Sequence, residues 1–174
     1  APLGGRVLLF VIYALTLAPG VTFWDAGEFI AAAHSLGIPH PPGTPLFVLL
    51  TNAWARVLFF LPFAVATNLF SAAATATASL IAARLVQRAT TSRPMTLAAA
   101  LAAGGMSSVW LNATETEVYA ASLLLAMVMI WAGDRAGRGT GERWTVLLAY
   151  LMMLAVPLHL SALVVAPAAV VLAS

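Results

Sequence analysis

Long stretches without a charged side chain dominate this sequence and restrict what it can fold into. Of the 174 residues, 62% are hydrophobic and only 14 are formally charged, eight basic and six acidic. An average soluble domain carries roughly 25% charged residues. The uncharged stretches cover residues 7–24, 57–83, 94–114, 118–133 and 144–174. Since most of them reach the roughly 18–20 residues that a helix needs to cross a bilayer, the pattern predicts an all-α integral membrane protein.

The positions of the arginines, which are the only basic residues, distinguish two topologies. If residues 44–61 cross the membrane, then Arg6 lies on one side and nearly all other arginines lie on the opposite side. If this stretch instead lies along the outer interface, Arg56 alone is outside. The side of Arg6 then collects Arg84, Arg88, Arg93, Arg135, Arg138 and Arg143. Because arginine-rich loops face the cytoplasm, we expect the second topology, with a cytoplasmic N-terminus.

This topology predicts a single transmembrane module over residues 1–174 with five to six spans. The spans lie near 6–20, 64–84, 94–112, 117–133 and 143–158, with a partial sixth at 160–174. The first loop, 21–63, is then wholly outside and carries two juxtamembrane helices near 25–36 and 45–60. Pro39, Pro41 and Pro42 separate these helices, because proline breaks a regular helix. The last span is cut short, so we expect the chain to be the N-terminal module of a longer protein.

The outer face collects most of the ionisable side chains that are not arginine. These are Asp25, Glu28, His34, His40, Glu115, Glu117 and His159. Ionisable residues are costly close to lipid, so their positions point to function. We therefore expect one polar site assembled from three outer loops.

Asp25 and Glu28 are the first candidates for chemistry in this site. Three residues apart, they share a helix face if the segment is helical. A carboxylate here can act as a general base, and a carboxylate pair, with Glu115 as a further ligand, can instead hold a divalent cation. The alternative is that Asp25 caps the N-terminus of the next helix.

Glu115 and Glu117 form a second acidic group at the outer end of the third span. They can contribute to binding a substrate at the same face. The alternative is that Thr114 or Thr116 caps the following helix and that the two glutamates occupy its first turn.

Three further residues are candidates for binding. His40, in a His-Pro-Pro-Gly turn, can bind an anionic head group or a metal, or it can be satisfied by backbone contacts. Arg56 is placed to meet a phosphate, which suits the arginine fork, or it extends to the lipid head groups. His159 either belongs to the site or packs within an apolar segment.

Several motifs in this chain resemble a known family. They are Trp24-Asp-Ala-Gly-Glu28, the turn from Leu36-Gly37 to His40-Pro-Pro-Gly-Thr-Pro-Leu46, Asn68-Leu-Phe-Ser71, Glu115-Thr-Glu-Val-Tyr119 and the region of His159. The family consists of bacterial multi-spanning membrane proteins, long labelled a domain of unknown function. It is related to the animal transmembrane protein O-mannosyltransferases and belongs to the GT-C superfamily of glycosyltransferases. The resemblance covers essentially the whole chain.

The resemblance implies a GT-C fold, with one span followed by a large outer loop that carries two juxtamembrane helices and an early catalytic aspartate. Asp25 resembles that catalytic carboxylate, with Glu28 beside it. Glu115 and Glu117 lie where relatives have a second acidic motif, and His40 lies in the loop motif of the family.

The implied reaction is inverting transfer of a sugar, with mannose as the expected sugar, from a polyprenyl-phosphate carrier to a hydroxyl acceptor. It would take place on the periplasmic face of a bacterial inner membrane. Asp25 would deprotonate the acceptor, and Arg56, His40 or a bound divalent cation would meet the charge of the leaving phosphate. The lipid tail would lie in a groove between spans.

Two other functions compete with this one. The chain can be a catalytically silent subunit that braces partner membrane subunits in a larger assembly, such as a photosynthetic or respiratory complex. A transporter is disfavoured, because no span carries a charge near its middle. The net charge of +2 reflects loop arginines and does not predict nucleic-acid binding. The expected partners are therefore membrane lipids and the lipid-linked sugar.

Overall fold

The computed structural model describes residues 2–90, 92–139 and 141–174, with side chains from Val7 onward, and every regular element in this part of the chain is a helix. The elements are α1 (Pro2–Leu15), α2 (Ala26–Ser35), α3 (Pro45–Val57), α4 (Phe63–Thr90), α5 (Arg93–Gly104), α6 (Ser107–Thr114), α7 (Val118–Gly137), α8 (Arg143–Leu158), the 3-10 helix η1 (Leu160–Val165) and α9 (Ala166–Ala173). The predicted all-α class is confirmed. The side chain of Arg6, used in the arginine count, lies outside the described residues, as do residues 91 and 140 of the predicted inner loops.

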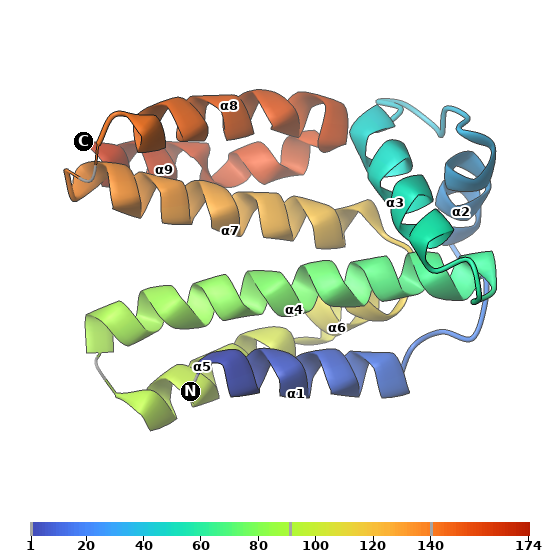
Figure 1. The fold of residues 1–174 in the computed structure, drawn as a ribbon, viewed down its shortest axis with the longest axis horizontal. Helices are drawn as coiled ribbons and strands as arrows, with labels where there is room; N and C mark the ends of the chain where they lie inside the picture. Colours follow the sequence, from blue (N-terminus) through green and yellow to red (C-terminus); the bar gives the residue numbers. More distant parts are fainter. Residues whose placement is uncertain (1, 91, 140) are drawn as a thin grey trace.

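The long helices lie side by side, and the two short helices of the first loop lie across one end of them (Figure 1). Helices α4 and α7 run through the middle; α8 and α9 lie on one side, and α1, α5 and α6 on the other. The end covered by α2 and α3 also holds the start of α4 and of α7 and the end of α8. The predicted pair of short helices within residues 21–63 is therefore present, and its prolines separate α2 from α3 as expected.

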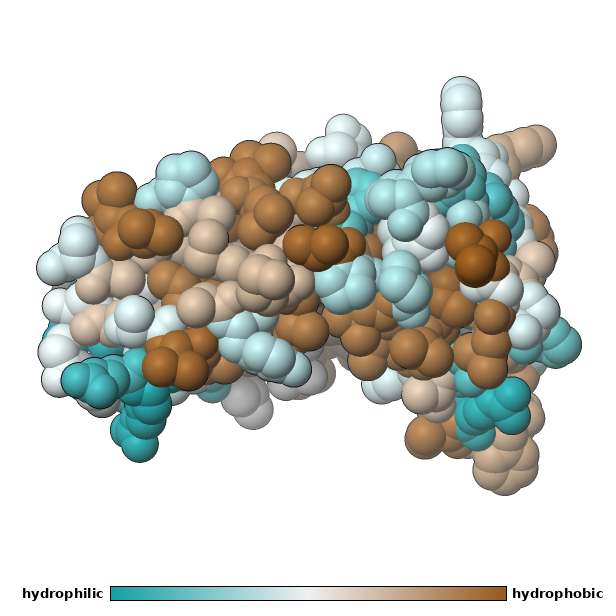
Figure 2. Space-filling view, turned by 90° about the horizontal axis from the view of Figure 1, so that it is seen from above, coloured by the Kyte–Doolittle hydropathy of each residue, from teal (hydrophilic) through white to brown (hydrophobic). Residues whose placement is uncertain are grey.

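Two helices, α4 and α7, are long and apolar enough to cross a membrane, and α5 with α6 makes a third if the pair counts as one bent span. Helix α8 and the segment Leu160–Ala173 are apolar but shorter. Figure 2 shows a surface of the kind expected for a protein that crosses a membrane, with apolar residues over the middle of the visible face and hydrophilic residues towards its two ends. The chain is a membrane protein with two or three candidate spans among the residues described, and the total of five to six stays a prediction.

The third predicted span, 94–112, is not one straight helix. Helices α5 and α6 meet at an angle of 68°. The break follows the adjacent glycines Gly104 and Gly105, and such a pair is a known cause of helix kinks. The hydroxyl of Tyr13 in α1 donates to the carbonyl oxygen of Gly104 at 2.7 Å. A Cβ at Gly104 would come within 2.8 Å of the Tyr13 and Leu9 side chains, so α1 packs tightly against the break.

Helix α9 packs against α7 at two glycines. A Cβ on Gly133 would overlap the carbonyl oxygen of Ala169, and one on Gly137 would overlap that of Leu172. Small residues four apart allow this backbone contact between membrane helices. The small residues of α4 and α5, such as Ala72, Ala76 and Ala100, are likewise buried between helices.

We expect Gly133→Val to separate α9 from α7 and to destabilise the fold by about 1–3 kcal/mol, the usual cost of overpacking a tight contact. Thermal unfolding in detergent micelles measures the effect. Ala136→Val, which adds bulk at a half-buried position of the same helix, is the matched control. Equal unfolding midpoints for the two variants would show that the close approach of α9 contributes nothing.

Candidate functional site

Asp25 occupies the N-cap position of α2, but its side chain does not cap the helix. Its backbone carbonyl accepts a hydrogen bond from the amide of Phe29 at 2.9 Å, whereas its carboxylate makes no capping bond. The side chain is half exposed, at 53%. The capping alternative is therefore right about the position of Asp25, but the carboxylate makes no capping bond and is accessible to a ligand.

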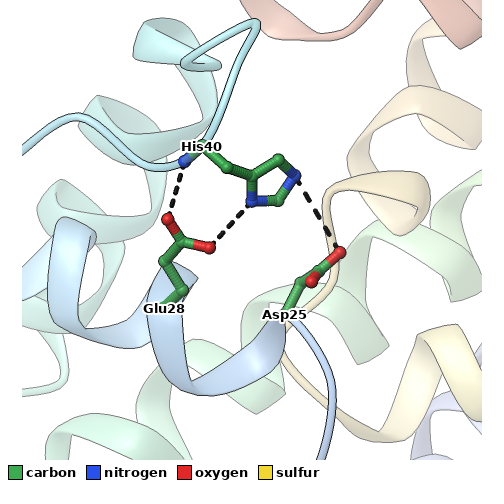
Figure 3. A group of neighbouring side chains, drawn as sticks. All are labelled: Asp25, Glu28 and His40. Carbon is green, nitrogen blue, oxygen red and sulfur yellow. Dashed lines mark hydrogen bonds and ion pairs between the residues drawn. The ribbon is translucent and has the colours of Figure 1, made fainter.

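Glu28, one helical turn further on, holds His40 at two points (Figure 3). The backbone amide of His40 donates to Oε1 of Glu28 at 2.7 Å, and Nδ1 of the ring lies 2.8 Å from Oε2. The other ring nitrogen, Nε2, lies 4.0 Å from a carboxylate oxygen of Asp25. The imidazole thus bridges the two carboxylates that the sequence placed on one helix face.

Three residues that flank α2 and the loop of His40 have left-handed backbone conformations. Non-glycine residues at positive φ occur at Trp24, just before Asp25, at Leu36, which ends α2, and at Thr44, which precedes α3. Such conformations cost of order 1–3 kcal/mol each and cluster at functional sites. The buried ring of Phe29 lies 5.6 Å from the His40 ring, so the loop contacts the core at this point.

The ion pair shifts both of its members towards their charged forms. The hydrogen bond from the His40 ring lowers the pKa of Glu28, and the same bond, with the nearby negative charge, raises the pKa of His40. Both side chains are exposed, at 45% and 44%, so water screens the interaction. The pair favours a carboxylate next to an imidazolium, which is a local positive charge beside Asp25.

Asp25, Glu28 and His40 could together hold a metal ion. One ligand atom from each lies within 4.8 Å of the other two. Two carboxylates and an imidazole are ordinary ligands for divalent cations. The third member of this group is His40; Glu115, which we predicted as a further ligand, is outside it because it lies at the end of α6.

Glu117 is the buried acid of the site. It is 8% exposed, and among the residues described its Oε2 has no hydrogen-bond partner. Its pKa is raised to about 7, chiefly by burial and in addition by the negative charges of Glu115 and Asp25, against the opposing charge of His40. Glu117 is therefore within electrostatic reach of the Asp25 and His40 pair.

Because the folded state favours the neutral form of Glu117, its contribution to stability is complete below pH 4.5 and is lost as the pH rises through 7. We therefore compare the free energy of unfolding of Glu117→Gln with that of the unmodified chain. From pH 4 to pH 8 this difference should change by about 3 kcal/mol in favour of the variant. Unfolding in micelles at both pH values measures it. Glu142→Gln, at an exposed site, should show no such difference; an equal gain for both would refute the assignment.

One alternative placed Glu115 and Glu117 in the first turn of the following helix, and this is wrong. Glu115 ends α6, Glu117 is the N-cap of α7, and α7 begins at Val118. The hydroxyl of Thr116 between them is buried and donates to Oδ1 of Asn68 at 2.6 Å. The segment is thus attached to α4.

Sequence reasoning missed the role of Asn68, although its motif was noticed. The Asn68 side chain is fully buried in α4, and its amide nitrogen donates to the carbonyls of Ala18 and Gly20, both at 3.0 Å. Together with its contact to Thr116, it joins the loop before Asp25 to the loop that carries Glu117. A buried asparagine in an apolar helix is the signal that points to such a role, since buried polar groups require partners.

His159 and Arg56 lie outside the cluster of Asp25, Glu28 and His40. The ring of His159 contacts that of Tyr119, two residues from Glu117, at 5.2 Å, and its Nδ1 lies 2.7 Å from the Ser161 hydroxyl. The Nε of Arg56 donates to Asn52 at 2.8 Å in a different pocket, formed with His34. The structure thus brings His159 near the acidic loop, whereas Arg56 has its described contact elsewhere.

Comparison with known proteins gives the family of this fold and site. Residues 25–174, which start at Asp25, match the family described as the protein O-mannosyl-transferase TMEM260 N-terminal domain. The chain belongs to this family. The match covers every element from α2 to α9, and so includes all the residues of the site.

Two relatives carry the same family name. The protein O-mannosyl-transferase tmem260 of Dictyostelium discoideum is 45% identical over 56 residues, which is 30% of this chain and 7% of that protein. The protein O-mannosyl-transferase TMEM260 of Mus musculus is 46% identical over 54 residues, 29% of this chain and 8% of that protein. These alignments therefore cover less than a tenth of the relatives' length. No solved structure matches the chain.

Proposed function

We propose that this chain carries the catalytic site of a GT-C-type glycosyltransferase that moves a sugar, with inversion, from a polyprenyl-phosphate carrier to a hydroxyl acceptor. The observation that carries the proposal is the Asp25 carboxylate, which does not cap its helix and lies beside the imidazole of His40. Membership of the O-mannosyl-transferase family supports the same chemistry. Mannose is the sugar that the family name suggests.

In this mechanism Asp25 takes the proton of the acceptor hydroxyl as the oxygen attacks the anomeric carbon of the sugar. The bond from that carbon to the phosphate oxygen breaks, and the polyprenyl phosphate leaves with the bonding electron pair. His40, which Glu28 holds and favours as an imidazolium, supplies a positive charge for the leaving phosphate. Glu115, Glu117 and His159 would line the acceptor side. A contact of Arg56 with this phosphate stays a prediction.

A divalent cation fits the same three side chains. Asp25, Glu28 and His40 would hold it, and when bound it would supply further positive charge near the leaving phosphate. The mechanism above does not require it, because His40 already provides a cationic group at this position.

An apolar groove next to the site supports a lipid-linked donor. It has a volume of about 250 Å³ and runs between α3, α4, α7 and α8. Its walls include Leu46, two residues after the loop that carries His40, and Leu158, which directly precedes His159. A polyprenyl tail in this groove would place its phosphate end close to His40.

We propose further that the end covered by α2 and α3 faces the periplasm of a bacterial inner membrane, with five to six spans and a cytoplasmic N-terminus. The ends of α4 and α7 that carry Arg88 and Arg135 lie at the opposite end of the molecule (Figure 1). Such an arginine-rich end is expected in the cytoplasm.

The direct test is transfer of mannose from polyprenyl-phosphate mannose to serine- and threonine-containing peptides by the full-length protein in liposomes. Transfer from this donor, but not from a soluble nucleotide sugar, is the expected result. Absence of transfer with every hydroxyl acceptor would favour the silent accessory subunit that was the alternative.

A further inference from the structure

A second pocket opens between α2, α3 and the start of α4, and it differs in charge from the candidate site. Its volume is about 310 Å³. The polar lining consists of His34, Asn52 and Arg56, and the apolar walls include Phe59, Leu61 and Phe63. None of the described residues that line it is a carboxylate, and none belongs to the cluster of Asp25, Glu28 and His40.

Arg56 is positioned in this pocket by a buried asparagine. Asn52 is 6% exposed; its amide nitrogen donates to the carbonyl of Ala33 at 2.7 Å, and its Oδ1 accepts from Nε of Arg56 at 2.8 Å. The arginine itself is exposed, and in the part of the chain that the structure describes no acceptor meets its two terminal nitrogens. These nitrogens form a pre-oriented fork, which suits two oxygens of a phosphate.

His34 adds a second donor on the facing helix. It follows Ala33, whose carbonyl Asn52 holds, so α2 and α3 are joined at the base of the pocket. The His34 ring packs edge-on against Phe63 at 4.9 Å. No described residue forms a hydrogen bond with its ring nitrogens, so they are available to a ligand.

The rim of the pocket is apolar and exposed. Phe59 lines the pocket and is 84% exposed, and its neighbours Val57 and Phe60 are 73% and 69% exposed, although all three are large hydrophobic residues. Val57 ends α3, and Phe59 and Phe60 lie in the link to α4, which is a candidate span, so all three lie where a membrane interface is expected. Lipid chains would cover such a rim, whereas a soluble peptide or free anion would leave it in water.

We propose that this pocket binds the phosphate of an anionic bilayer phospholipid, with Arg56 and His34 donating to its oxygens and its acyl chains lying against Phe59 and Phe60. The positive charge selects the anion, and the apolar rim selects an amphiphile. The site shares no lining residue with the cluster of Asp25, Glu28 and His40, and a lipid bound there would fix the α2–α3 pair against the membrane surface.

The chain contains no cysteine, so Ser35→Cys beside His34 gives a unique position for an environment-sensitive fluorophore. The labelled full-length protein, with any cysteine beyond this chain replaced, is titrated in micelles with dihexanoyl-phosphatidylglycerol, dihexanoyl-phosphatidylcholine or inorganic phosphate. We expect saturable binding of the phosphatidylglycerol, weaker by about tenfold or more in Arg56→Gln, since a charge-assisted hydrogen bond is lost. His34→Gln should weaken it severalfold, and Arg84→Gln, an exposed arginine near the end of α4, should leave it unchanged.

Three results would overturn the proposal. Equal affinity for phosphatidylcholine would show that the pocket does not recognise the net negative charge of the lipid. Equal affinity for inorganic phosphate would show that the acyl chains do not contribute to binding. An unchanged affinity in both Arg56→Gln and His34→Gln, with unaltered circular dichroism, would exclude the pocket.

Discussion

Asp25→Asn in the full-length protein is expected to reduce mannose transfer from the polyprenyl carrier by about a hundredfold to ten-thousandfold, the usual contribution of a general base. The amide cannot accept the proton of the acceptor hydroxyl, whereas its shape is nearly that of the carboxylate. Since the Asp25 side chain does not cap α2, the substitution should leave the unfolding midpoint unchanged. The rate at saturating donor and acceptor is the measurement.

Glu142→Gln is the matched control, because it removes one exposed carboxylate at the N-cap of α8, far from α2 along the molecule (Figure 1). Its rate should equal that of the unmodified protein. Equal rates for Asp25→Asn and Glu142→Gln would exclude Asp25 as the base. If Asp25 acted only by holding a cation, excess metal would restore the rate of Asp25→Asn in part, and His40→Ala would show the same rescue.

Asn68→Ala is expected to destabilise the chain by about 2–4 kcal/mol, because several buried hydrogen bonds are lost and their partners stay unsatisfied. The side chain is fully buried and bonds Ala18, Gly20 and Thr116. Since these residues belong to the loops before Asp25 and beside Glu117, transfer should fall as well. Unfolding in micelles and the transfer rate measure the two effects.

Asn112→Ala provides the comparison. Among the residues described, its amide donates to the carbonyl of Ser108 within the same helix, at 2.7 Å, and the contact is exposed. We expect a change in stability of less than about 0.5 kcal/mol for such a surface substitution. A similar loss in both variants would mean that Asn68 does not join the two loops.

Local features of the fold could be predicted from the sequence, because they depend on neighbouring residues. The three prolines predicted the break between α2 and α3. The spacing of Asp25 and Glu28 predicted that their side chains lie on the same face of a helix. The bend between α5 and α6 was missed: the two glycines permit a kink, but Tyr13, which takes the released carbonyl, is distant in sequence.

The site was predicted in part for the same reason. His40 was a candidate from its turn, yet nothing in its spacing shows that it returns to Glu28 rather than to lipid. Glu115 was predicted as a metal ligand because it is acidic and on the same face. The third ligand atom within reach of Asp25 and Glu28 is instead in the His40 ring, and its return to α2 is a tertiary contact that hydropathy does not reveal.

The double contact between Glu28 and His40 has a consequence for how a donor enters. Glu28 occupies the Nδ1 side of the His40 ring and its backbone amide, so the bonds that fix the ring to α2 lie on one side of it. The other nitrogen, Nε2, faces Asp25 at 4.0 Å. A phosphate that approaches Nε2 would therefore leave the His-Pro-Pro-Gly turn attached to α2 and would meet the ring beside the carboxylate proposed as the base.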